Sequence, residues 1–316
     1  MADKRVRRSS MRKKGFSLAR LKHIKGLAII AKAAIYFLLI CIGFVYLEPI
    51  FEMISKSLMA AADLVDPAIT WLPKNFTPDN FKAAYSTLGL PGSLWNSIWI
   101  SGLFALAQTI VSATTGFALS RYRFTGKGIW FGMIILGFIL PVPLLTVPRI
   151  MVFQVASDTI GYTLFGTVIP QLLMSALGQG AYSTILILIF YNFFNMIPTS
   201  LDEAAMIDGA NALKVFYHVA IRLSASTILV VFMFSFVFNW NETYTTNCFL
   251  GTSAYPLLPA KLASFESDLQ SGGAEGVNEA YQMAATLISI APLLLLYSLI
   301  QKQFIEGIEN AGITGE

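Results

Sequence analysis

Charged residues are scarce in this chain of 316 residues. They make up 13% of it, hydrophobic residues make up 55%, and the mean hydropathy is +0.64. About 25% of the residues in an ordinary soluble domain are charged, so the composition excludes such a domain and predicts an integral membrane protein. Asp, Glu, Lys and Arg are absent from five apolar runs, at 97–120, 129–148, 159–201, 223–241 and 280–301. Each run supplies the ~20 apolar residues that a helix needs to cross a bilayer core.

Cysteine and histidine are also scarce, with two of each. Cys41 lies inside an apolar run and Cys248 beyond another, so no disulfide framework is predicted. His218 has no Cys, Asp or second His at the spacing of a zinc site. An intramembrane enzyme needs a nucleophile with a base, or a metal cluster. The sequence therefore predicts neither a metal site nor a catalytic residue in this chain.

Two further kinds of transporter are disfavoured by what the chain lacks. A proton- or ion-driven transporter usually carries ionisable residues within its spans, and five of the predicted spans have none. A self-contained ATP-driven pump needs G-x-x-x-x-G-K-[ST]. The nearest string, at 126–128, lacks the first Gly and the Ser or Thr. Any ATP hydrolysis must therefore belong to another chain.

The fold class predicted is an all-α integral membrane protein with six transmembrane helices. We place them at about 27–47, 97–120, 129–148, 165–188, 223–241 and 280–301. The run at 159–201 is long enough for two helices that turn at 178–180. Lys and Arg concentrate on the cytoplasmic side of membrane proteins, and one span there puts most of them inside, together with both termini. The remainder, 189–197, is then expected along the cytoplasmic interface, and the basic tail, 1–26, on anionic headgroups.

Small residues and prolines mark two of these spans. Gly116 and its small neighbours in the run 97–120 predict close helix packing. Pro141, Pro143 and Pro148 break the backbone hydrogen bonds of the run 129–148, which predicts a kink there.

The segment 198–222 is polar and helix-forming, between two apolar runs. Ser200 and Glu203 have the spacing of a capping box, in which each side chain caps a backbone N–H of the other. Gly209 is suited to a left-handed turn that ends the first helix, and Asn211 is suited to cap a second helix. The sequence therefore predicts a cytoplasmic helix-turn-helix over 198–222.

This segment resembles the EAA loop of ABC importer permeases. The match consists of Glu203, Ala204, Ala205, Asp208 and Gly209 with Ala210, followed by Ile221 and Leu223. In that family the loop docks into a cleft of an ATPase subunit, so the resemblance implies that the first five of these residues couple transport to ATP hydrolysis. It also implies that ATP and Mg²⁺ bind the partner ATPase subunits and that this chain binds no cofactor. The family has Pro where this chain has Ser224, which we expect to cap the fifth span.

Three further strings resemble the carbohydrate-type permeases, in particular the smaller maltose-type permease. They are L-P-x-N-F-T-x-x-N-F at 72–81, W-N-E at 240–242 and the stretch 301–308, and the resemblance runs from about Ala34 to the end. It implies import of a sugar or oligosaccharide across a bacterial or archaeal plasma membrane. The implied partners are a second permease in a heterodimer, two ATPase subunits and an extracellular or periplasmic solute-binding protein.

The candidate residues for the translocation path or for contact with the binding protein lie beyond the fifth span. They are Trp240, Asn241, Glu242, Tyr244 and Tyr255. Aromatic and polar residues side by side suit sugar rings, but they equally suit the aromatic belt at a membrane interface. The loop 243–279, with a flexible tip at 271–276, is expected to reach the binding protein. The alternative for this loop is a solvated linker with a short helix near 258–265. The alternatives are a permease of the same architecture for an amino acid or polyamine and, third, a channel-like or scaffolding membrane protein.

Overall fold

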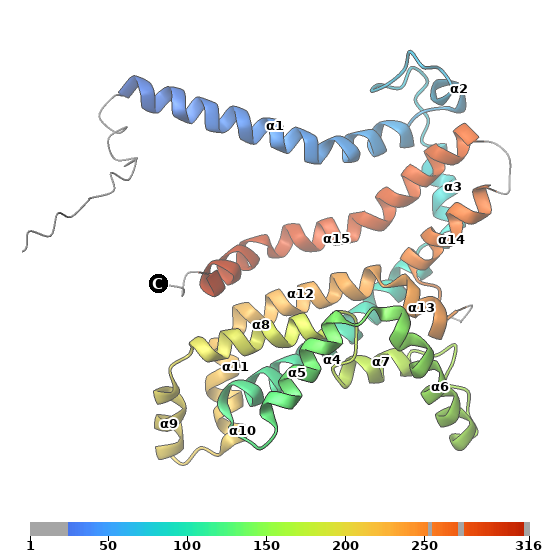
Figure 1. The fold of residues 1–316 in the computed structure, drawn as a ribbon. Helices are drawn as coiled ribbons and strands as arrows, with labels where there is room; N and C mark the ends of the chain where they lie inside the picture. Colours follow the sequence, from blue (N-terminus) through green and yellow to red (C-terminus); the bar gives the residue numbers. More distant parts are fainter. Residues whose placement is uncertain (1–24, 252–254, 271–274, 313–316) are drawn as a thin grey trace, which may run out of the picture. The chain divides into compact units, whose positions relative to one another are not determined.

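The computed structural model describes residues 25–251, 255–270 and 275–312 (Figure 1). Within these residues the secondary structure is helical, apart from one isolated β-bridge between Met59 and Phe76. The chain forms two compact units that divide after Met53. Most of the predicted basic tail lies outside the described residues.

The helices follow one another as listed here: α1 (Lys25–Ser57), α2 (Ala61–Leu64), α3 (Asp79–Thr87), α4 (Gly92–Arg121), α5 (Lys127–Ile139), α6 (Val142–Ile160), α7 (Ile169–Ala176), α8 (Ser183–Met196), α9 (Thr199–Ile207), α10 (Ala212–Val215), the π-helix η2 (Phe216–Ala220), α11 (Ile221–Leu223), α12 (Ala225–Asn241), α13 (Thr243–Phe249), α14 (Leu258–Gln270) and α15 (Glu275–Gly312).

Three helices among the described residues are long and apolar enough to cross a membrane, within α1, α4 and α15. Three bent pairs pass the same test when each pair is taken together. They are α5 with α6, α8 with α9, and the helix 212–223 with α12. The described chain therefore offers three candidate spans, or six if every bent pair is one span.

The core of the larger unit is built around α4, which packs against α8 and α12 (Figure 1). At the crossing with α8, a Cβ atom added to Gly116 would lie 2.6 Å from Cβ of Phe190 and 2.9 Å from the backbone nitrogen of Tyr191. No residue other than glycine fits such an approach, so the predicted packing role of this small residue is confirmed. Phe190 and Phe194 of α8 are fully buried in the same cluster.

The third apolar run is bent more strongly than a kink. α5 ends at Ile139, α6 begins at Val142, and the two helices are bent by 108°. Leu140, directly before Pro141, is extended, with ψ of 127°. Proline disfavours the helical conformation of the preceding residue, which explains why the expected span 129–148 is not one continuous helix.

The fourth apolar run also differs from expectation. The range 165–188 contains α7 and the start of α8, separated by a turn in which Gly178 has a φ of 72°. The remainder, 189–197, belongs mostly to α8 and buries Phe190 and Phe194 against α4, so our expectation of an interfacial segment there is wrong. Burial of these two aromatic rings in the core favours a helix that packs inward over one that lies along the membrane surface.

The predicted outer loop is largely helical. α13 and α14 occupy much of 243–270, and α14 contains the short helix that the alternative of a solvated linker placed near 258–265. α15 begins at Glu275, five residues before the expected last span. Residues 271–274 of the expected flexible tip lie outside the described residues.

Candidate functional site

The segment 199–223 folds into a helical hairpin. α9 ends in a turn where Gly209 has a φ of 84°, a conformation that glycine adopts without Cβ strain. The backbone N–H of Ala210 donates to the carbonyl oxygen of Ala205 at 2.9 Å, which closes this turn. Asn211 then caps α10, because its Oδ1 accepts from the backbone N–H of Lys214 at 2.9 Å. The two helices and the sharp bend predicted from Gly209 and Asn211 are therefore present.

The predicted capping box is wrong. α9 begins at Thr199 with Pro198 in the N-cap position, and no side chain caps it. Ser200 therefore already lies inside the first turn, where its hydroxyl is not placed to cap. Glu203 is exposed, and its side chain makes no hydrogen bond or ion pair with the described part of the chain.

Ser224 does not cap the next helix with its side chain either. Its hydroxyl donates to the carbonyl oxygen of Ile221 at 3.2 Å, and its own carbonyl accepts from the N–H of Ile228. The backbone N–H of Ser224 also donates to the carbonyl oxygens of Ala220 and Ile221, so this residue closes the preceding turn and does not cap α12 with its side chain. The chain instead bends by 81° here.

One face of the hairpin is buried and the other is exposed. Val215, Phe216 and Ala220 pack into the cluster that contains Phe117 and Phe194. The opposite face exposes Met206, Ile207, Leu213 and Tyr217, and 86% of Ile207 is accessible. Ala204 and Asp208 are exposed and Ala205 is half-buried. An exposed apolar group of this kind typically marks an interaction surface.

A buried ion pair fastens the hairpin to α4, and no local sequence pattern predicts it. Nε of Arg121 lies 2.7 Å from Oδ2 of Asp202, and their side chains are only 9% and 10% exposed. Nη2 of Arg121 also donates to the carbonyl oxygen of Ile197 at 2.9 Å. The pair is a close charge contact without an aligned hydrogen bond, since Nε of Arg121 and Oδ1 of Asp202 lack hydrogen-bond partners. Arg121 thus holds the end of α8 and the start of α9 together across their 73° bend.

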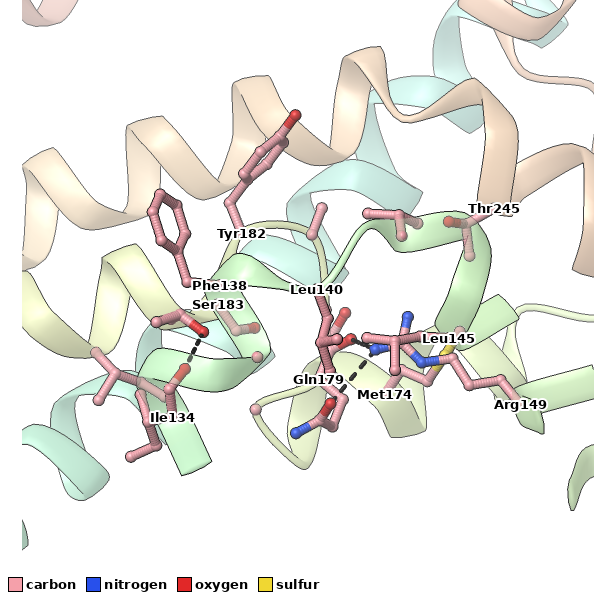
Figure 2. Close-up of a pocket in the computed structure, with 18 of the residues that line it drawn as sticks. Ile134, Phe138, Leu140, Leu145, Arg149, Met174, Gln179, Tyr182, Ser183 and Thr245 are labelled. Atoms are coloured by element: carbon pink, nitrogen blue, oxygen red, sulfur yellow. Dashed lines mark hydrogen bonds between the residues drawn. The ribbon is translucent and has the colours of Figure 1, made fainter. Parts of the chain in front are cut away.

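A cavity of about 440 Å³ opens between α5, α6, the turn 178–182 and the end of α12. Figure 2 shows the Arg149 side chain reaching toward the Gln179 turn. Nη2 of Arg149 donates to the carbonyl oxygen of Gln179 at 3.1 Å and to its Oε1 at 3.3 Å. Leu145 and Met174 lie near Arg149, and Phe138 lines the other end of the cavity, near Ser183 (Figure 2).

Gln108 of α4, which is fully buried, supports one wall of this cavity. Its Nε2 donates to the carbonyl oxygen of Ala181 at 2.6 Å and to Oγ of Ser183 at 2.7 Å. Its Oε1 accepts from Ser235 at 2.6 Å and from Nδ2 of Asn239 at 2.9 Å. A single amide thereby fixes the turn before α8 and the C-terminal half of α12. A polar residue inside the otherwise apolar run 97–120 was the signal that could have identified it.

The five predicted path residues occupy different environments. Trp240 is buried, with 3% exposed, in a core cluster with Phe236 and Leu258. Asn241 is exposed and donates to the carbonyl oxygen of Val237, and Tyr244 is also exposed. Tyr255 meets the edge of Trp99 with ring centroids 5.9 Å apart. Of the five, Glu242 lines the cavity, and it also caps α13 by accepting from the N–H of Thr245 at 2.8 Å.

Comparison with known proteins agrees with this architecture. A family profile described as "Binding-protein-dependent transport system inner membrane component" matches residues 108–310. The sn-glycerol-3-phosphate transport system permease protein UgpE of Pectobacterium atrosepticum is 30% identical over 74% of this chain and 87% of its own length. The probable ABC transporter permease protein YurM of Bacillus subtilis is 27% identical over 84% of this chain and 83% of its own.

A solved structure shares the fold. It is a bacterial ABC transporter involved in the import of the acidic polysaccharide alginate, with 22% identity and a TM-score of 0.69 over 87% of this chain and 96% of the other. The profile covers α8, the hairpin and α12, the elements that carry the site, as well as the end of α4 from Gln108 to Arg121. The chain therefore belongs to the family of inner-membrane components of binding-protein-dependent transport systems.

Proposed function

We propose that the chain is the permease subunit of an ATP-binding-cassette importer for a sugar or oligosaccharide. The observation that carries this proposal is the hairpin, which presents an exposed apolar face and an exposed Glu203 beside the left-handed turn at Gly209. The names of several relatives support the substrate class, among them an arabinooligosaccharide permease of Halalkalibacterium halodurans. The alginate importer with the same fold also handles a carbohydrate.

In this proposal the chain supplies half of the translocation path and catalyses no reaction. It pairs with a second permease, two ATPase subunits bind ATP and Mg²⁺, and an external solute-binding protein delivers the sugar. Glu203, Ala204, Ala205, Asp208 and Gly209 lie on the surface that enters the ATPase cleft. The chain crosses the plasma membrane six times, with both ends in the cytoplasm, and the region between α13 and α15 reaches toward the binding protein.

Gly209→Val tests the role of the hairpin. A β-branched side chain at positive φ is strained, so the turn should open and the surface for the ATPase should be lost. We expect the variant to insert into the membrane at wild-type level while co-purification of the ATPase subunits and sugar uptake both fall at least tenfold. Gly89→Val is the matched control, since Gly89 also has a positive φ and open space around it but lies before α4.

Normal uptake and normal transport-stimulated ATP hydrolysis in Gly209→Val would contradict the proposal. An equal loss in the Gly89→Val variant would show that strain at any left-handed glycine disrupts the protein, and the hairpin would then have no special role.

A further inference from the structure

Two basic side chains in the loop between α4 and α5 have no acidic partner in the described part of the chain. Arg123 is exposed, and its guanidinium makes no hydrogen bond or ion pair with the described residues. Nζ of Lys127 donates to the carbonyl oxygen of Tyr122 at 3.2 Å, and it forms no ion pair with the described carboxylates. Arg121, by contrast, is committed to Asp202. The loop therefore carries two positive charges that the described chain does not neutralise.

The fold of the loop brings these two charges together. Gly126 has a φ of 83°, and the backbone N–H of Lys127 donates to the carbonyl oxygen of Phe124 at 3.2 Å, so the chain turns back between Arg123 and Lys127. The carbonyl group that Lys127 binds belongs to the peptide bond that joins Tyr122 to Arg123. The ammonium group thus lies beside the backbone of Arg123. One of its three N–H groups is used there, and the five N–H groups of the guanidinium remain available.

The loop also lies between two segments that can cross a membrane. It joins α4, a candidate span, to α5, the first half of a bent candidate span. No residue of α5 is buried, and 71% of Ile129 in its first turn is exposed, outside the cavity beside Arg149. Phe124 is 42% exposed. The two charges are therefore flanked along the chain by exposed apolar side chains at the edge of the membrane.

This edge is the one on which the hairpin lies. The ring of Tyr122 meets the edge of Phe117 of α4, with ring centroids 6.0 Å apart. Phe117 in turn contacts Phe216 of the hairpin, with ring centroids 5.1 Å apart. The loop and the hairpin therefore share one end of α4.

We propose that this loop binds an anionic phospholipid in the leaflet on the hairpin side. The headgroup phosphate accepts from Arg123 and Lys127, and the acyl chains cover Phe124 and Ile129. Hydrogen bonds between ionised partners are stronger than neutral ones. A zwitterionic lipid would bring a positive group of its own next to these two cations, and a soluble phosphate would leave both apolar side chains exposed to water. The inference goes beyond the proposed function, because it does not depend on the cargo.

Photoactivatable lipids test the site. The full-length chain, assembled with its partner subunits, is placed in phosphatidylcholine vesicles that contain a trace of photoactivatable phosphatidylglycerol or, separately, photoactivatable phosphatidylcholine. Peptides that contain residues 122–130 are then analysed by mass spectrometry. We expect phosphatidylglycerol to label them at least about fivefold more than phosphatidylcholine, which corresponds to the ~1 kcal/mol contributed by one basic residue near an anionic surface. In R123Q/K127Q the two lipids should label these peptides equally.

Two controls separate a site from a general attraction of charges. K74Q/K82Q removes two exposed positive charges from the segment before α4 and should leave the labelling of 122–130 unchanged. Raising the ionic strength with chloride should reduce the preference for phosphatidylglycerol in the wild-type protein, because salt screens exposed charges. This second measurement needs no substitution. Inorganic phosphate at the same ionic strength should reduce the preference no further.

Four outcomes overturn the inference. Equal labelling by the two lipids in the wild type shows that the loop does not select an anionic headgroup. An equal loss of preference in K74Q/K82Q shows that only the overall charge matters. Stronger competition by inorganic phosphate than by chloride assigns the two cations to a soluble phosphate. Absence of labelling by either lipid shows that a partner subunit covers the loop. Sugar uptake is not measured in this experiment, so each of these outcomes leaves the proposed function intact.

Discussion

Asp63 stabilises the polar segment between α1 and α3 by accepting hydrogen bonds from Asn75. The carboxylate accepts from the backbone N–H and from the side-chain amide of Asn75, both at 2.7 Å. The backbone N–H of Asn75 is the main cause that lowers the pKa of Asp63 below its usual value of 3.8, and the side-chain amide adds to it. This contact joins α2 to the strand-like pairing of Met59 with Phe76.

The sign of the pKa change predicts how this segment responds to acid. Because the pKa of Asp63 is lower in the folded chain, its stabilising contribution is complete above the unfolded pKa, about 3.9, and is lost as the pH falls through the lower folded value. We expect hydrogen exchange at Asn75 to accelerate below about pH 4 in wild type. In Asp63→Asn it should be fast at every pH. Asp66→Asn serves as control, since its carboxylate is 41% exposed and should affect Asn75 less. Identical exchange profiles in wild type and Asp63→Asn would contradict the prediction.

Single residues were predictable where their role is local. Gly209 and Asn211 were identified because a left-handed turn and a helix cap depend on neighbours within four residues. The capping box at Ser200 failed for an equally local reason, since Pro198 begins the helix earlier. The hydrogen-bond partners of Gln171 and Gln108 could not be predicted, because they lie more than 70 residues away.

At the scale of elements, the ion pair of Arg121 and Asp202 fastens α9 to α4. Removing one partner leaves a buried charge without compensation, which typically costs about 3–5 kcal/mol. We therefore expect Asp202→Ala to lower the thermal stability of the purified chain and to reduce uptake, and the double variant R121D/D202R to recover part of both. Asp79→Ala breaks the pair of Asp79 with Lys82, whose side chains are more than 70% exposed, and it should change stability by less than about 1 kcal/mol.

Equal melting temperatures in Asp202→Ala and Asp79→Ala would show that the buried pair adds nothing to the attachment of α9. Recovery in R121D/D202R is the more specific readout, because a variant that merely packs badly at position 202 would not be improved by a second change at position 121.

Bends were predictable from the sequence when a residue enforces them. Pro141 predicted that the third run is kinked. The angle of 108° between α5 and α6 depends on the packing around both helices and was not predicted. A turn at 178–180, where α7 and α8 separate, was one of the two alternatives for the run 159–201, but the distribution of Lys and Arg favoured a single span there. The contact of Gly116 with Phe190 joins two residues that are more than 70 positions apart, which no local pattern reveals.

At the scale of the whole molecule, the topology remains a prediction with a direct test. Cys41 and Cys248 are first replaced by serine, and single cysteines are then introduced as S200C and L72C at two exposed positions. We expect an impermeant maleimide added outside intact cells to label L72C, because the segment between α1 and α4 is external in the predicted topology. S200C should react only after permeabilisation.

Labelling of S200C from outside would mean that the run 159–201 crosses the membrane twice, and everything after it would then have the opposite orientation. Labelling of neither position before permeabilisation would contradict the external assignment of the segment before α4.

The glycine contact between α4 and α8 has a mechanical consequence. The backbone of α8 at Phe190 already lies against Gly116 with no free space between them, so α4 and α8 cannot move closer together. The segment 199–223 joins α8 to α12 through elbows of 73° and 81°, and both of those helices lie against α4. The segment 199–223 therefore connects two helices that both pack on the same third helix, α4. A displacement of the exposed face of the segment 199–223, at Ile207 or Leu213, cannot be taken up by closer packing of α8 on α4. We therefore expect it to rotate α8 and α12 together.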